Sequence, residues 1–240
     1  DVQQFKFHGA QAEALQYTAT FADGNRMQIV VPKDRVKGLT GDLLRLTGLQ
    51  GTAVEMAQRT DWLGGVTRSL TGLTGQNYTV GQVADAVGHL PQESRQQFRQ
   101  VVVNTVQNPD DAYWAKAYKM KDFRSYMTSG AAGVTEIYPA DSAHRLAGTE
   151  YMRISLLHES GHIYSDSHWG GDPNADTPGW TAWRAAEKAD GGYVSRYATS
   201  SPAEDFAETF AAYFSTKGTP RFAAYRAKAP HRFAILDAVK

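Results

Sequence analysis

Five consecutive residues, His158-Glu159-Ser160-Gly161-His162, have the types and the spacing of a metal-dependent hydrolytic site. They lie in residues 145–164, a stretch rich in Leu and Ile that predicts a helix. On a helix, positions four apart differ in direction by about 40°, so the two imidazoles would project side by side and could share one metal ion. Glu159 beside them could take a proton from a metal-bound water. The alternative is a helix with two exposed histidines and a glutamate.

A zinc hydrolase also needs a third protein ligand and one open position for water. Residues 201–213 predict a helix with Ser201 as its N-cap and Pro202 in its first turn. Glu204 and Glu208 lie four residues apart in this largely apolar segment, where burying an acidic side chain is costly unless it has a partner. We expect Glu204 to bind the metal and Glu208 to accept the free ring N–H of a ligand histidine. The alternative is a pair of solvated acids that favour the helix dipole.

His168 is the rival third ligand. It follows His162 by six residues, the spacing of the third histidine in the metzincin pattern HExxHxxGxxH. Ser165 occupies the glycine position of that pattern, and the last methionine is Met152, so no Met-turn can follow. If it is not a ligand, we expect His168 to be a loop residue close to the substrate.

Two further segments carry a family resemblance. Residues 204–210 read Glu-Asp-Phe-Ala-Glu-Thr-Phe, and residues 228–233 read Lys-Ala-Pro-His-Arg-Phe. Together with the HExxH sequence, residues 150–240 resemble the gluzincin metallopeptidases of the anthrax lethal factor type, which include bacterial Pro-Pro endopeptidases and toxin-associated metallopeptidase domains. The resemblance implies that Glu204 is the third zinc ligand. It also implies that Tyr197, seven residues earlier, faces the zinc and donates a hydrogen bond to the developing oxyanion.

The composition excludes several other classes of protein. The 240 residues include 25 basic and 25 acidic side chains, a balance that argues against a nucleic-acid partner. No apolar run approaches the roughly 20 residues that span a membrane. The absence of cysteine excludes disulfides, thiolate nucleophiles and iron–sulfur clusters. The chain begins at Asp1 and shows no signal-peptide pattern, so we interpret it as a processed piece of a longer product.

The predicted fold is α+β and mostly helical, zincin-like, with a small sheet flanking the active-site helix. A turn at residues 108–110 divides an N-terminal accessory portion, 1–108, from a catalytic domain, 109–240. The first portion would contain a hairpin around Asp23-Gly24, short helices and loops over 39–75, and helices over 80–87 and 93–106. The second would contain an edge strand over 133–138 and helices over 180–189, 202–214 and 220–240. Glu136 on that strand and His168 are candidate substrate-binding residues.

These expectations combine into a Zn²⁺-dependent endopeptidase with His158, His162 and Glu204 as ligands. Glu159 would be the general base and Tyr197 the stabiliser of the oxyanion. The partners would be a protein or peptide substrate and a delivery domain or inhibitor protein. The resemblance favours a secreted bacterial effector or toxin domain that is delivered into a target cell. The alternatives are a metzincin-like protease that uses His168, a non-toxic processing protease, and a structural or non-proteolytic site.

Overall fold

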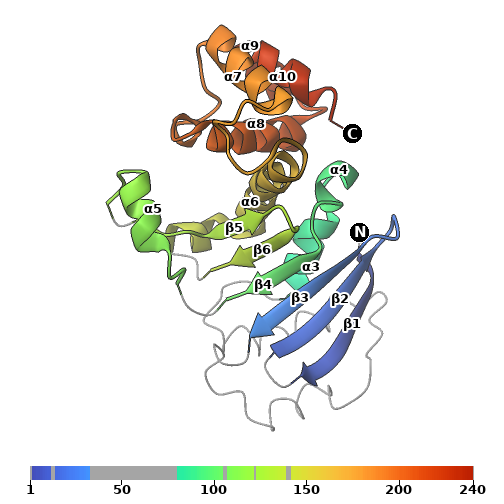
Figure 1. The fold of residues 1–240 in the computed structure, drawn as a ribbon. Helices are drawn as coiled ribbons and strands as arrows, with labels where there is room; N and C mark the ends of the chain where they lie inside the picture. The colour runs from blue at the N-terminus through green and yellow to red at the C-terminus, as the bar shows by residue number, and fades with distance from the viewer. Residues whose placement is uncertain are drawn as a thin grey trace. The chain divides into compact units, whose positions relative to one another are not determined.

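The computed structural model describes residues 2–11, 14–32, 80–104, 107–121, 123–138 and 142–239. They form an α+β fold, as the sequence predicts (Figure 1). The chain divides into two compact units. The sheet unit comprises Asp1–His89, Phe98–Thr128 and Val134–Arg153, and the helical unit comprises Leu90–Gln97, Ser129–Gly133 and Ile154–Lys240.

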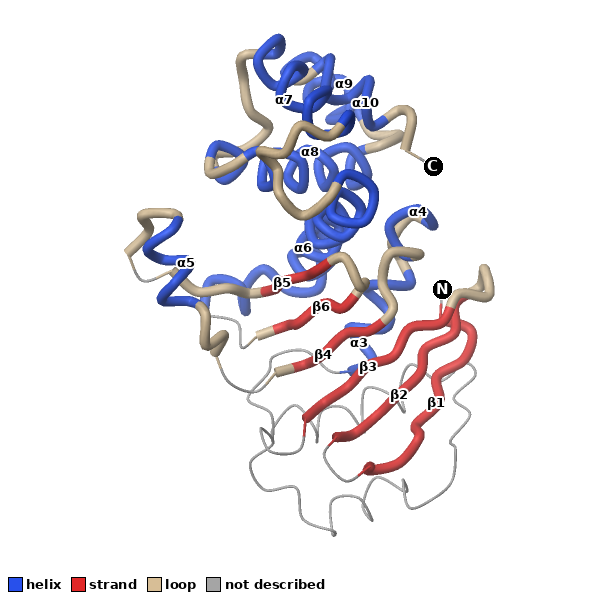
Figure 2. Tube along the Cα trace, in the orientation of Figure 1, coloured by secondary structure: helices blue, strands red, loops and turns tan. Residues whose placement is uncertain are grey.

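The described strands form one mixed sheet in the order β1-β2-β3-β4-β6-β5 (Figure 2). The β1–β2 and β2–β3 pairs are antiparallel, whereas β3–β4 and β4–β6 are parallel. In β3, Met27 and Ile29 are buried whereas Arg26 and Gln28 are exposed, the pattern of a strand with one face on a core. The bounds are β1 Val2–Gln11, β2 Ala14–Phe21, β3 Arg26–Pro32, β4 Gln100–Val103, β5 Met127–Gly130 and β6 Val134–Ile137.

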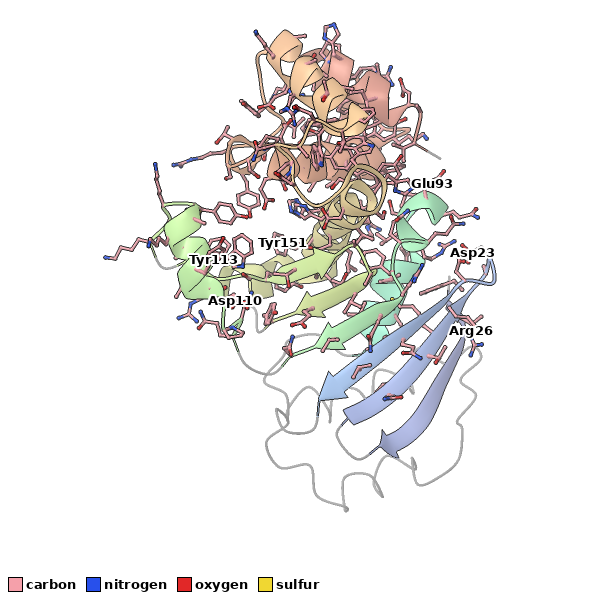
Figure 3. The ribbon with its side chains drawn as sticks, viewed as in Figure 1. Asp23, Arg26, Glu93, Asp110, Tyr113 and Tyr151 are labelled. Atoms are coloured by element: carbon pink, nitrogen blue, oxygen red, sulfur yellow. The ribbon has the colours of Figure 1, made fainter. Side chains whose placement is uncertain are left out.

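The hairpin predicted around Asp23-Gly24 is confirmed as the turn between β2 and β3. Gly24 has a positive φ of 82°, a conformation that glycine adopts without strain. The backbone N–H of Asn25 donates to Oδ1 of Asp23 at 3.0 Å. Asp23 and Arg26 lie at this tip of the hairpin (Figure 3). Because β3 pairs with β4, the hairpin belongs to the same sheet as β6.

Two predictions for residues 93–138 are wrong. The helix expected over 93–106 is replaced by a short helix, α4 (Gln92–Arg95), and by strand β4. Three consecutive β-branched valines, 101–103, favour the extended backbone, and pairing with β3 and β6 stabilises it. The strand expected at the edge over 133–138 is β6, which lies between β4 and β5, so β5 forms that edge.

The sheet unit draws residues from both sides of the turn at Asn108. β4 precedes the turn and β6 follows it, and the two strands pair directly. The division into 1–108 and 109–240 stays a prediction, and the helices and loops expected over 39–75 lie outside the described residues. The unit also contains α3 (Val80–Gly88), which contacts β1, and α5 (Asp111–Ala117). Tyr151, at the sheet-unit end of α6 (Ser142–Trp169), packs on Tyr126 with ring centroids 5.4 Å apart (Figure 3).

The helical unit contains α6 from Ile154 onward and a group of helices that contact one another (Figure 1). Aromatic side chains form its core, and Trp180, Trp183, Phe206, Phe210 and Phe233 are less than 2% exposed. No helix among the described residues is long and apolar enough to cross a bilayer. The remaining bounds are α7 Pro178–Asp190, η2 Tyr197–Thr199, α8 Pro202–Thr216, α9 Pro220–Lys228 and α10 Pro230–Leu236.

The predicted helices over 145–164, 180–189 and 202–214 correspond to α6, α7 and α8. The C-terminal helix predicted from 220 onward is interrupted. It breaks at Ala229, whose φ of −138° is not helical, and α10 begins with Pro230. Proline has no backbone N–H, so it is tolerated in the first turn of a helix but disrupts the interior of one.

Candidate metal centre

One stretch of α6 carries His158, Glu159 and His162, all within the helical unit. Leu156, Leu157 and Ile163 of the same stretch are buried and fix its rotation about the helix axis. The two imidazole rings lie side by side with centroids 4.7 Å apart, as their spacing of four residues predicts.

Gly161, inside the HExxH sequence, lies at the close approach of α6 and α8. A Cβ atom at this position would lie 3.0 Å from Cα of Ala207 and 3.2 Å from Cβ of Phe210. The first contact is with backbone, which cannot swing aside as a flexible side chain can. The absence of a side chain at Gly161 therefore allows the two helices to approach closely enough for α8 to present a residue to the histidines.

That residue is Glu204, in the first turn of α8. Ser201 caps the helix, since its hydroxyl oxygen accepts the backbone N–H of Glu204 at 3.2 Å, and Pro202 follows as the sequence predicts. The side chain of Glu204 is buried, and its Oε2 lies 3.1 Å from Nε2 of His158 and 3.3 Å from Nε2 of His162.

The three atoms form a triangle, because the two Nε2 atoms are themselves 3.0 Å apart. Among the described residues, His158, His162 and Glu204 are the one group of three such side chains with the spacing to hold a metal ion. A tetrahedral zinc with bonds of about 2.0–2.1 Å requires ligand atoms about 3.3 Å apart. Sides of 3.0 to 3.3 Å fit that requirement, and two imidazoles with a carboxylate are a donor set that zinc accepts.

Glu208, one helical turn after Glu204, contacts the far side of His158. Its Oε1 lies 2.8 Å from Nδ1 of His158, a distance at which the ring N–H donates to the carboxylate. With the proton on Nδ1, the lone pair of Nε2 points toward Glu204 and His162. Glu208 thus selects the tautomer of His158 that can bind a metal.

The electrostatics of this cluster favour a positive charge. Burial alone would lower the pKa of His158, but hydrogen bonds to Glu204 and Glu208 raise it to about 10. Burial likewise would raise the pKa of Glu204, yet the two histidines hold it well below its usual range. A field that stabilises a proton on an imidazole also stabilises a cation placed between the same groups.

Glu159 is buried beside the triangle without belonging to it. Burial raises the pKa of its carboxyl group, and the neighbouring histidines and Ser129 oppose that rise. Its Oε2 atom has no hydrogen-bond partner among the described residues. A buried carboxylate with a vacant acceptor atom beside a metal-binding group can accept a proton from water.

Tyr197 lies close to His158. It begins the short 3-10 helix η2 just before α8, and its ring centroid is 5.9 Å from that of His158. Ser195 precedes it: its hydroxyl oxygen accepts the backbone N–H of Ala198 at 3.1 Å, and its side chain hydrogen-bonds to Glu208. No spacing rule connects a single serine with a distant glutamate, so the sequence does not predict the contacts of Ser195 and Ser129 with the site.

His168 does not join the metal-binding group. The α6 helix continues through Ser165 to Trp169, whereas the metzincin pattern needs a turn at that point. His168 is exposed, its ring stacks on Tyr164 at 4.2 Å, and its Nδ1 lies 2.9 Å from the carbonyl oxygen of Tyr164. It is therefore a helix residue and not the loop residue that the sequence predicts.

Glu136 lies in the other unit, on β6. Its Oε2 accepts hydrogen bonds from Nδ2 of Asn104 at 3.0 Å and from the hydroxyl of Tyr138 at 2.6 Å. The structure therefore assigns its carboxylate to a local hydrogen-bond network within the sheet unit, and its role in binding a substrate stays a prediction.

An α+β fold whose long helix pairs two histidines with a glutamate from a second helix has the architecture of a metallopeptidase. Residues 95–229 match the model of a family described as "putative zinc-binding metallo-peptidase", and these residues are more than half of the chain. The chain belongs to this family. The matched region includes the HExxH sequence, Tyr197, Glu204 and Glu208, and it ends before α10. No curated protein matches the chain.

Proposed function

We propose that the protein is a zinc-dependent endopeptidase of the gluzincin class, with His158, His162 and Glu204 holding the ion. The observation that carries the proposal is the triangle of three ligand atoms with sides of 3.0 to 3.3 Å. Membership of a metallopeptidase family supports it. The sequence of residues 204–210 and the closeness of Tyr197 to His158 support the finer assignment to the lethal factor type.

A zinc ion held there would supply Lewis acidity, which lowers the pKa of a water molecule to about 7 and polarises a peptide carbonyl. Glu159 takes the proton as the water attacks and later passes it to the leaving nitrogen. The hydroxyl group of Tyr197 donates a hydrogen bond to the oxyanion that develops on the carbonyl oxygen. Glu208 keeps the Nδ1 proton on His158 throughout, so that Nε2 stays available.

The test is digestion of a complex peptide library by the zinc-loaded protein, read by mass spectrometry. Replacing Glu159 with Gln should keep zinc bound and lower the turnover about 10²- to 10⁴-fold, because the amide cannot accept the proton. Glu150→Gln is the matched control: Glu150 lies on the same helix, is exposed, and pairs with Arg153. Full turnover by Glu159→Gln would refute the general-base role of Glu159. Absence of cleavage by the zinc-loaded wild type would refute the proposed endopeptidase activity.

We also propose that the protein acts as a secreted bacterial effector on protein substrates inside a target cell. The support is the resemblance of residues 150–240 to toxin-associated metallopeptidase domains. Expression of the chain in a host cell should slow growth, and expression of Glu159→Gln should not. Equal growth with the two forms would favour the non-toxic processing protease.

A further inference from the structure

Arg232, on α10, is a fully buried arginine with three separate hydrogen-bond acceptors. Its Nε donates to Oδ2 of Asp190 at 3.0 Å, its Nη1 donates to Oδ1 of Asp205, and its Nη2 donates to the carbonyl oxygen of Gly192. The side chains of Arg232, Asp190 and Asp205 are all 0% exposed. A guanidinium presents five N–H donors in a rigid fork, so one side chain can fix three acceptors at once.

The three acceptors belong to three consecutive parts of the helical unit. Asp190 is the last residue of α7, and Gly192 follows the left-handed Gly191, whose φ is 65°. Asp205 lies in the first turn of α8, and its other oxygen accepts the indole N–H of Trp183 at 3.0 Å. Arg232 thus hydrogen-bonds to both ends of the segment 192–205.

That segment carries much of the candidate site. It contains Ser195, whose side chain hydrogen-bonds to Glu208, and Tyr197, whose ring lies 5.9 Å from that of His158. It ends with Glu204 and Asp205, neighbours on α8 whose side chains have different partners. Glu204 faces the two histidines, and Asp205 faces Arg232.

Stability alone gives no reason for a buried guanidinium between two buried carboxylates. Replacing such buried ionic groups with well-packed apolar side chains is often neutral or stabilising, because removing the charges from water is costly. What an apolar replacement cannot reproduce is the fixed direction of three hydrogen bonds. The three bonded groups here all border the segment that presents Tyr197 and Glu204.

We propose that Arg232 is a positioning residue of the metal centre. Through Gly192 and Asp205 it holds both ends of the segment 192–205, so that Glu204 and Tyr197 stay against the HExxH part of α6. This inference rests on the proposed function of the site. Arg232 contacts none of the three ligand atoms, and its effect reaches them through Asp205 and the backbone.

The experiment uses the full chain and the Arg232→Lys variant. Lysine keeps the charge but presents one compact ammonium in place of the fork, so it cannot satisfy Asp190, Asp205 and Gly192 together. Arg226→Lys is the matched control, because Arg226 of α9 pairs with Asp237 and both are 41% exposed. The readouts are zinc affinity by competition with a chelator, the visible absorption spectrum of the Co²⁺-substituted protein, and the melting temperature.

We expect Arg232→Lys to bind zinc about 10- to 100-fold more weakly than the wild type, the usual range for groups that orient metal ligands. Its Co²⁺ spectrum should change as well, since that spectrum reports the arrangement of the ligands around the ion. Arg226→Lys should stay within about twofold of wild type with an unchanged spectrum. A loss of thermal stability without a change in zinc affinity or spectrum would show that Arg232 is structural only, and would overturn the proposal.

Asp205→Asn provides a second test that keeps the volume of the side chain. It should also weaken zinc binding. The double variant should lose no more zinc affinity than the weaker-binding single variant, because both changes disrupt the same Arg232–Asp205 interaction. If Arg232→Lys fails to fold, Asp205→Asn alone tests the positioning role. Wild-type zinc affinity in that variant overturns the proposal. A wild-type chain that binds no zinc would refute the proposed function itself, whereas wild-type binding that Arg232→Lys leaves intact would refute the positioning role alone.

Discussion

The two units each enclose a half-buried or buried glutamate, and the two carboxylates have opposite kinds of neighbour. In the sheet unit, Glu136 accepts hydrogen bonds from the amide of Asn104 and the hydroxyl of Tyr138. In the helical unit, the Oε2 atom of Glu204 faces the Nε2 atoms of His158 and His162. The Oε2 atom of Glu136 accepts from neutral donors, whereas the Oε2 atom of Glu204 faces two ring nitrogens that carry a hydrogen only in one tautomer or when the imidazole is protonated.

The groups that face a carboxylate distinguish a structural carboxylate from a metal ligand. Neutral donors satisfy a buried carboxylate permanently, so the network around Glu136 needs no further component. Acceptor atoms that converge on one point repel each other until a proton or a metal ion lies between them. Glu204 and Glu208 raise the pKa of His158 to about 10 against the effect of burial, which means that a positive charge is stabilised at this position.

The largest expected contrast follows from exchanging each glutamate for glutamine. Glu204→Gln should lose the zinc ion, because a neutral amide is a much weaker ligand than a carboxylate. At a free zinc concentration 1,000 times Kd, binding stabilises the wild-type protein by about 4 kcal/mol. That increment should disappear in Glu204→Gln, and calorimetric unfolding with and without zinc measures it.

Glu136→Gln is the matched control and should behave in the opposite way. Its amide keeps one acceptor oxygen, but Asn104 and Tyr138 lose a charged partner, which should cost about 1–3 kcal/mol of stability. The increment from zinc should remain. If Glu136→Gln loses that increment, or Glu204→Gln keeps it, the distinction between the two carboxylates fails.

A smaller effect on zinc affinity is expected from Glu208→Gln, because Glu208 hydrogen-bonds to the ligand His158 and is not itself a ligand. Glutamine can accept the Nδ1 hydrogen of His158 through its amide oxygen, but without the negative charge that strengthens the imidazole as a ligand. Zinc affinity should fall about 10- to 100-fold while the stoichiometry stays at one ion, as measured by chelator competition. A variant with unchanged affinity would make Glu208 a solvated acid of the first turns of α8.

How much of the site could be predicted depended on whether the relation between residues was local. The neighbouring imidazoles and the pair Glu204 and Glu208 follow from one helical turn, so spacing alone predicts that each pair shares a helix face. The four residues of β4 fall inside the helix predicted over 93–106, because so short a segment does not separate the helical periodicity from that of a strand. Asp205 and Arg232 lie in two segments that carry the family resemblance, but no spacing rule connects them, since their ion pair depends on the packing of α10 on α8.

The exchange of Gly161 for alanine should have the smallest effect, and it tests the geometry that brings Glu204 to the histidines. The added Cβ would lie 3.0 Å from backbone of α8, so the helices must separate by a few tenths of an ångström. Overpacking of this kind costs about 1–3 kcal/mol, and we expect zinc affinity to fall severalfold because the triangle widens. Gly171→Ala is the control, since its nearest contact would be Oδ1 of Asp166 at 3.9 Å. If the two variants bind zinc equally well, the close approach of α6 and α8 at Gly161 does not set the spacing of the ligands.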